Sequence, residues 1–149
     1  MPDGYIPIEI DRELLAEYGS AFAWFNLVED SLGEVIYFRG RLSKIDPKLA
    51  DKLIGGKTLG AKIQLASIYI EPKTIEKLKK LNTYRIELSH GVVSETVDLG
   101  NPNQRTRNYF LTHKNKDIPL THDRLSEAIS LAKELSEFLM LEIKGEQHC

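Results

Sequence analysis

The chain has 149 residues, of which 42% are hydrophobic and 28% charged, as in an ordinary globular protein. It contains no apolar run near eighteen residues and no signal-peptide pattern in its first thirteen residues, so we expect a cytoplasmic protein without a membrane-spanning helix. Its one cysteine, Cys149, excludes a disulfide framework, and we expect neither a metal site nor a cofactor.

The formal net charge of −2 argues against a general nucleic-acid binder, but the charge is unevenly distributed. Residues 1–34 hold eight acids and one base, residues 35–116 hold sixteen bases and seven acids, and residues 117–149 hold seven acids and three bases. If the central segment forms one basic face, that face would attract phosphate. Charges spread over the solvated surface of long helices explain the pattern equally well, and the sequence leaves both explanations open.

The longest predicted helix follows a short extended segment at residues 5–10. Asp11 is typical of an N-cap residue, and helical spacing continues to about Arg39. The apolar stripe of this helix consists of Leu14, Tyr18, Phe22, Phe25, Leu32 and Ile36, bordered by Ala21 and Val28. Glu29 falls inside this stripe, which is an unusual position for a carboxylate.

Two shorter helices are predicted next. Asp46 and Pro47 open the first, and Gly55 and Gly56 close it. Thr58 caps the second, which we expect to continue to residue 70.

Pro72 begins the following helix, and Gly91 is typical of the residue that ends one. Its apolar stripe consists of Ile75, Leu78, Leu81 and Leu88, and Arg85 falls in the middle of it. A buried arginine needs a partner because its desolvation costs several kcal/mol. If the two long helices pack together, Glu29 and Arg85 can satisfy each other, and we predict that they form a hydrogen-bonded pair.

The last third of the chain combines two strands with a helix. Residues 92–99 and 106–112 have β-like composition around a turn at residues 100–103, which predicts a β-hairpin inserted over residues 92–113. A loop is expected at residues 114–117. Thr121 or Asp123 then caps a last helix to about Lys144, and residues 145–149 are expected to be disordered. We therefore predict one all-α domain over residues 1–149, an antiparallel bundle of four to five helices with the hairpin between the helix of Arg85 and the last helix.

Residues 81–91 read Leu-Asn-Thr-Tyr-Arg-Ile-Glu-Leu-Ser-His-Gly. This segment resembles the active motif of the HEPN superfamily, a group of all-α ribonuclease-like modules with Arg, four to six residues and then His. The extended motif, Leu-Asn-x-x-Arg-Asn-x-x-Ala-His-Gly, is matched by Leu81, Asn82, Arg85, His90 and Gly91, with Ser89 in place of the alanine. One position departs from it: Ile86 stands where a polar residue is usual, so a group that would help to orient His90 is missing.

The resemblance implies a metal-independent endoribonuclease, a hydrolase of the kind found in toxin–antitoxin and phage-defence systems. It also implies a homodimer whose two motifs face each other, RNA as substrate, and possible restraint by a cognate antitoxin. His90 would act as acid or base, Arg85 would stabilise the phosphoryl oxygens, and Glu29 and Asn82 would support them. The candidate RNA-binding residues are Lys77, Lys80, Arg105 and Arg107, the last two on a hairpin that is equally well explained as a structural flap.

Other interpretations of the same residues remain open. A histidine before a glycine that ends a helix is favourable because a cation suits the negative end of the helix dipole, and an arginine can extend its charge from a stripe into water. A catalytically weak or inactive HEPN-like dimer that binds nucleic acid or a partner protein is the alternative function, and Ile86 favours it. His113 and His122 show no metal-ligand spacing.

Overall fold

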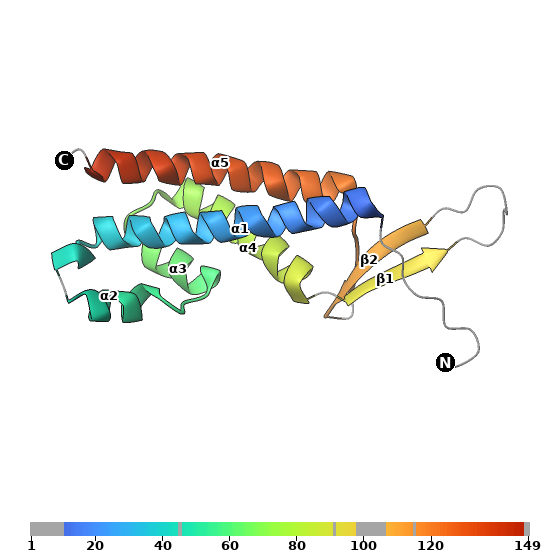
Figure 1. Cartoon of the computed structure of the whole chain (residues 1–149), viewed down its shortest axis with the longest axis horizontal. Helices are drawn as coiled ribbons and strands as arrows, with labels where there is room; N and C mark the ends of the chain where they lie inside the picture. Colours follow the sequence, from blue (N-terminus) through green and yellow to red (C-terminus); the bar gives the residue numbers. More distant parts are fainter. Residues whose placement is uncertain (1–10, 45, 91, 98–106, 115, 148–149) are drawn as a thin grey trace.

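The computed structural model describes residues 11–44, 46–90, 92–97, 107–114 and 116–147. These residues are mostly helical, which confirms the all-α expectation at this coarse level, and Figure 1 shows the helices with a small sheet at one end. The helical elements are α1 (Arg12–Arg39), the 3-10 helix η1 (Leu42–Lys44), α2 (Pro47–Ile54), α3 (Leu59–Ala66), α4 (Pro72–His90) and α5 (His122–Gln147). None of the described helices is both long and apolar enough to cross a membrane.

The two longest helices, α1 and α5, lie side by side and run in the same direction (Figure 1). Glu17 contacts His122 where both helices begin, and Arg39 contacts Glu142 near their C-terminal ends. The prediction of an antiparallel bundle is therefore wrong for this pair. The reason is that α4 returns the chain to the sheet end of the molecule, so α5 starts beside the start of α1.

Side-chain caps explain where the helices begin. Asp11 accepts a hydrogen bond from the Glu13 amide, Asp46 from the Lys48 amide and Thr58 from the Ala61 amide, and Thr121 accepts from the Arg124 amide. All four caps were predicted, Thr121 as one of two alternatives. The prediction that the third helix reaches residue 70 is wrong, because α3 ends at Ala66 and residues 67–70 form a turn. The Ser67 hydroxyl donates a hydrogen bond to the Gln64 carbonyl, and the Tyr69 amide donates to the Ala66 carbonyl three residues before it, so a turn replaces the helix here.

A three-stranded antiparallel sheet follows α4, in the order β1 (Val92–Val97), β2 (Arg107–His113) and β3 (Lys116–Pro119). Val92 lies opposite Thr112, and Leu111 lies opposite Ile118. β1 and β2 pair within the segment where the sequence predicts a hairpin, whereas its turn at residues 100–103 lies outside the described residues. The loop predicted at residues 114–117 is wrong for residues 116 and 117, which begin β3. Lys114 is a turn residue with a positive φ of 49°.

The hydrophobic core is continuous from the helices to the sheet. Its largest fully buried side chains include Phe25, Leu32, Leu78, Leu111 and Leu135. The last helix continues to Gln147, so the expected disordered tail is wrong for residues 145–147, and residues 148–149 lie outside the described part of the chain. The extended segment predicted at residues 5–10 lies outside it as well.

Candidate functional site

The predicted motif occupies the second half of α4, whose buried face there includes Leu81 and Leu88. Arg85 lies about 40° from Leu81 and about 60° from Leu88 around the helix and is half-buried. His90 is the last helical residue and is exposed. Because α4 stays helical through His90, the five-residue step turns His90 about 140° away from Arg85. One copy of the chain therefore does not bring these two side chains to the same face of α4.

Glu29 on α1, the predicted partner of Arg85, is paired with Lys62 of α3. The Lys62 Nζ atom lies 3.6 Å from the Glu29 Oε1 atom, and the two side chains are only 13% and 20% exposed. Since α3 packs against both α1 and α4, Lys62 approaches the carboxylate from an intervening element. The predicted Glu29–Arg85 pair is wrong. Lys62 could have been noticed in the sequence, because it follows Leu59 by three residues and precedes Ala66 by four, beside the buried stripe of α3.

Arg85 forms no ion pair or hydrogen bond with any residue in the described ranges of the chain. A half-buried guanidinium has lost part of its hydration, and a missing partner leaves that cost uncompensated. Its planar fork of donors fits a carboxylate or a phosphate through two parallel hydrogen bonds. Arg85 thus offers a positive charge that an external anion can neutralise.

Asn82 lies one turn before Arg85 and packs against the start of α3. A Cβ atom added at Gly60 would lie 3.3 Å from the Asn82 Nδ2 atom, so the amide rests on glycine backbone. The Oδ1 atom of Asn82 is buried and finds no hydrogen-bond partner among the residues that the structure describes. A buried acceptor without a donor costs about 1–3 kcal/mol, so close packing against Gly60 holds this side chain in place.

The last turn of α4 is joined to α1 by Tyr18. The Tyr18 hydroxyl donates a hydrogen bond to the backbone carbonyl of Leu88, which belongs to the set of carbonyls that a helix end leaves without an intrahelical partner. Burial raises the pKa of Tyr18 above its ordinary value of 10.0, so the hydroxyl keeps its proton at neutral pH. The sequence placed Tyr18 in an apolar stripe and gave no signal for this bond.

The candidate RNA-binding residues do not form one group. Lys77 is engaged in an ion pair with Glu134 of α5. Lys80 is exposed and pairs with no residue of the described ranges. Arg107 is the first residue of β2, but its side chain is outside the description, and Arg105 lies entirely outside the described residues. Lys80 is therefore the one of these four whose charge the structure shows to be available.

A polar network that the sequence did not reveal connects α4 to α5. Tyr84 donates a hydrogen bond to Glu127 Oε2 over 3.0 Å, and the Arg124 guanidinium lies 5.2 Å from the centre of the Tyr84 ring. Arg124 also forms an ion pair with Glu87. Burial is the largest cause that raises the pKa of Tyr84 above 10.0, and the hydrogen bond to Glu127 adds to it. These contacts fix the face of α4 that packs against α5.

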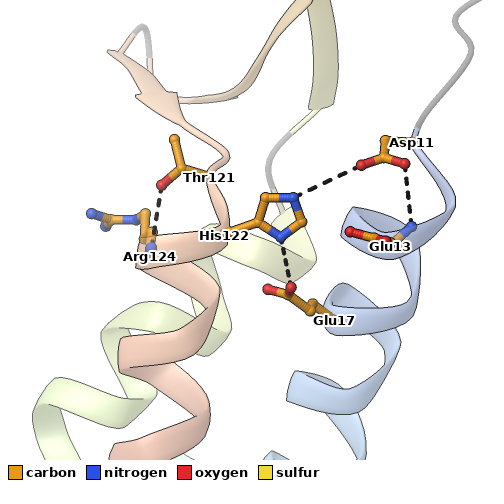
Figure 2. Close-up of polar contacts among 6 residues, drawn as sticks. All are labelled: Asp11, Glu13, Glu17, Thr121, His122 and Arg124. Carbon is orange, nitrogen blue, oxygen red and sulfur yellow. Dashed lines mark hydrogen bonds and ion pairs between the residues drawn. The ribbon is translucent and has the colours of Figure 1, made fainter.

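Figure 2 shows a second polar cluster where α1 and α5 begin, with the His122 ring between Asp11 and Glu17. The His122 Nδ1 atom lies 2.6 Å from Glu17 Oε1, and the Nε2 atom lies 3.8 Å from Asp11 Oδ2. The hydrogen bond to Glu17 is the main cause that raises the pKa of His122 above its ordinary 6.5. Since 105 residues separate His122 from Glu17, sequence spacing could not reveal this cluster.

Within the described ranges, Asp11, Glu13 and His122 come closest to a metal-ligand set. One ligand atom from each lies within 4.8 Å of the other two. All three side chains are exposed, Asp11 also caps α1, and His122 is held by Glu17. Contacts between the two helix starts are a sufficient explanation for this arrangement.

Comparisons of the chain with models of known protein families, with curated proteins and with solved structures give no match.

Proposed function

We propose that this chain is a HEPN-like, metal-independent endoribonuclease that acts as a homodimer. The observation that carries the proposal is the state of Arg85, a half-buried guanidinium whose expected carboxylate is bound to Lys62 instead. A phosphodiester supplies the bidentate anion that such a group lacks. Further support comes from the resemblance of residues 81–91 to the HEPN motif.

The proposed reaction uses the RNA's own 2′-hydroxyl as the nucleophile. This oxygen attacks the adjacent phosphorus, the bond to the 5′-oxygen breaks, and the products are a 2′,3′-cyclic phosphate and a 5′-hydroxyl. His90 takes the proton from the 2′-hydroxyl or gives one to the leaving oxygen. Arg85 stabilises the charge that develops on the phosphoryl oxygens.

A second copy of the chain has a specific role in this proposal. Arg85 and His90 leave α4 in directions about 140° apart, so one motif alone does not surround a phosphate. Two facing motifs would supply an arginine from one copy and a histidine from the other. The toxin or phage-defence role and the cognate antitoxin belong to the same proposal and rest on the resemblance.

A non-catalytic dimer that binds nucleic acid or a partner protein is the second candidate, and Ile86 favours it. This half-buried isoleucine follows Arg85 directly and has no hydrogen-bonding group that could orient His90. Binding to RNA needs only the charge of Arg85, whereas cleavage also needs the positioned imidazole.

The deciding experiment is incubation of the purified protein with mixed RNAs in EDTA. We expect cleavage by the wild type and at least about a 10²-fold loss of rate in His90→Ala and in Arg85→Ala, the usual scale for removing an acid–base group or a charge stabiliser. Arg12→Ala is the matched control, because Arg12 is an exposed arginine in the first turn of α1. Equal cleavage by wild type and His90→Ala would identify a contaminating nuclease. A wild type that binds RNA tightly without cutting it would support the non-catalytic dimer.

A further inference from the structure

The Oδ1 atom of Asn82 is the only buried side-chain atom without a hydrogen bond in the part of the chain that the structure describes. Proteins rarely leave a buried side-chain acceptor unpaired, because it has lost its bonds to water and gained none in return. The position of this oxygen therefore needs a physical explanation. A donor that reaches it only in another state of the protein would supply one.

Helix geometry limits which donors can reach the oxygen. The side chains next to Asn82 on α4 are those three or four residues before and after it, namely Leu78, Lys79, Arg85 and Ile86. Leucine and isoleucine carry no donor. Lys79 donates to Glu76 Oε1 over 3.3 Å, and its side chain points toward the start of α4, away from Asn82. Arg85 is therefore the helical neighbour that can donate to Asn82.

The direction of the Arg85 side chain favours this contact. Long side chains of a helix lean toward its N-terminus and lie over the turn three and four residues before them. The stem of Arg85 therefore leads toward the turn that holds Asn82. The guanidinium carries five N–H donors and forms no hydrogen bond or ion pair in the described ranges. A set of unpaired donors and an unpaired acceptor thus lie one helical turn apart.

Gly60 of α3 leaves room for the Asn82 amide. A Cβ atom added at Gly60 would lie 3.3 Å from the Asn82 Nδ2 atom, which is tighter than an ordinary contact. Gly60 is helical and has no positive φ, so its backbone does not require glycine. Space for the amide is the reason that the structure offers for glycine at this position. A larger residue there would push Asn82 out of its place.

We propose that Asn82 is a positioning residue, held against Gly60, whose Oδ1 atom accepts a hydrogen bond from Arg85 when a phosphoryl oxyanion binds that arginine. The anion takes two donors along one edge of the guanidinium, and one of the other three N–H groups reaches Asn82. Anion binding then satisfies the unpaired donors and the unpaired acceptor together. The hydrogen bond fixes the plane of the guanidinium as well as its position.

This inference rests on the proposed function, because it assigns how Arg85 is oriented toward a phosphoryl group. A bidentate contact needs the correct plane as well as the correct place, and small misplacements of a catalytic group lower the rate. The hydrogen bond can nevertheless be measured without any cleavage. Its test therefore does not depend on ribonuclease activity.

The first experiment follows the Arg85 Nε–H signal in ¹H–¹⁵N spectra of the full-length protein, with inorganic phosphate as the probe. The signal is assigned by its absence from Arg85→Met. We expect phosphate to slow hydrogen exchange of this group about tenfold more in the wild type than in Asn82→Leu, the scale of one hydrogen bond to a charged group. Equal slowing in both proteins, or no effect of phosphate on the wild type, would overturn the proposal.

Two further variants separate the acceptor from the packing. Asn82→Asp keeps an oxygen at the same place and should slow the exchange even without phosphate, because a carboxylate is the stronger acceptor for a guanidinium. Gly60→Ala should lose most of the phosphate-dependent slowing, although alanine is the better helix former. Gly19→Ala is the matched control, because nothing lies within 4 Å of a Cβ atom at Gly19. Wild-type behaviour of Gly60→Ala would overturn the role of Gly60.

Cleavage of RNA in EDTA gives a second readout. Asn82→Leu should lower kcat about tenfold without a comparable rise in KM, and it should cause no further loss in an Arg85→Ala protein. The reason is that a residue acting through Arg85 has no effect once Arg85 is gone. An equal loss in both backgrounds would overturn the positioning role. A wild type that does not cleave RNA would contradict the proposed ribonuclease, and the phosphate titration would then still decide the role of Asn82.

Discussion

Lys62 of α3 and Glu29 of α1 form a largely buried ion pair, with 3.6 Å between Nζ and Oε1. Gly33, one turn after Glu29, borders the pair: a Cβ atom there would lie at an ordinary contact distance of 3.8 Å from the Lys62 Nζ atom and at a tight 3.2 Å from Ile54 Cγ2 of α2. The pair connects two helices on the side of the core that supports α4. It also engages Glu29, the carboxylate that was predicted to pair with Arg85.

Removal of Lys62 should destabilise the fold. Lys62→Ala leaves the Glu29 carboxylate in a largely buried place without its partner, and we expect the free energy of unfolding to fall by about 1–3 kcal/mol. Urea denaturation followed by circular dichroism measures this change. The double variant Lys62→Met with Glu29→Leu removes both charges and should recover most of the loss. A single variant as stable as the wild type would mean that the carboxylate does not depend on Lys62.

The His122 cluster should give a measurable proton linkage. Glu17 raises the pKa of His122 above 6.5 in the folded protein, so the contribution of the protonated imidazole is complete below the ordinary pKa and is lost as the pH rises through the folded pKa. An NMR titration should show His122 with a pKa above 6.5 in the wild type and a lower value in Glu17→Gln. Glu13→Gln is the control, because Glu13 is a smaller contributor than Glu17. Identical titrations of the wild type and Glu17→Gln would contradict the assignment.

Local signals in the sequence were sufficient for most helix limits. Asp11, Asp46 and Thr58 are polar caps that act within three residues of their own position, so each start can be recognised from a short segment. The helix that begins at Pro72 was also placed correctly through His90. The end of α3 and the strand β3 were missed because a turn at residues 67–70 and a positive φ at Lys114 have weak sequence signals.

Contacts between distant segments could not be predicted in the same way. Helical periodicity gave the face of each helix on which Glu29 and Arg85 lie. It could not show whether a charged residue of a third helix would pair with one of them instead. Lys62 intervenes from α3, and the parallel arrangement of α1 and α5 was equally inaccessible to periodicity. The sequence therefore named the individual candidate residues, whereas only the packed structure shows which residues they contact.

The oligomeric state is a direct consequence of the proposed function. We expect light scattering at micromolar concentration to give about twice the 16.9 kDa mass of one chain. Mixing inactive His90→Ala with inactive Arg85→Ala should restore part of the activity if each site draws one residue from each copy. A monomer at these concentrations, or no recovery on mixing, would contradict the shared site.

Ile86 provides a test of how the imidazole is oriented. Ile86→Asn places a hydrogen-bonding group one turn before His90, on the same side of α4. We expect this variant to cleave RNA in EDTA at least as fast as the wild type, with the same 2′,3′-cyclic phosphate and 5′-hydroxyl ends. Ile86→Val is the control for side-chain volume. If the wild type and Ile86→Asn are both inactive on mixed RNAs, the function is binding rather than cleavage.

The Tyr18 hydroxyl should determine how firmly the end of α4 is held. Tyr18→Phe removes the donor to the Leu88 carbonyl and keeps the ring, so we expect a loss of about 0.5–1.5 kcal/mol in unfolding free energy. Amide exchange in the last turn of α4, next to His90, should become faster because the carbonyl end of the helix loses its anchor. Tyr37→Phe is the matched control, since Tyr37 is also a half-buried tyrosine of α1 and its hydroxyl bonds to no residue of the described ranges. If both variants show the same exchange pattern, the Tyr18 bond does not hold this turn.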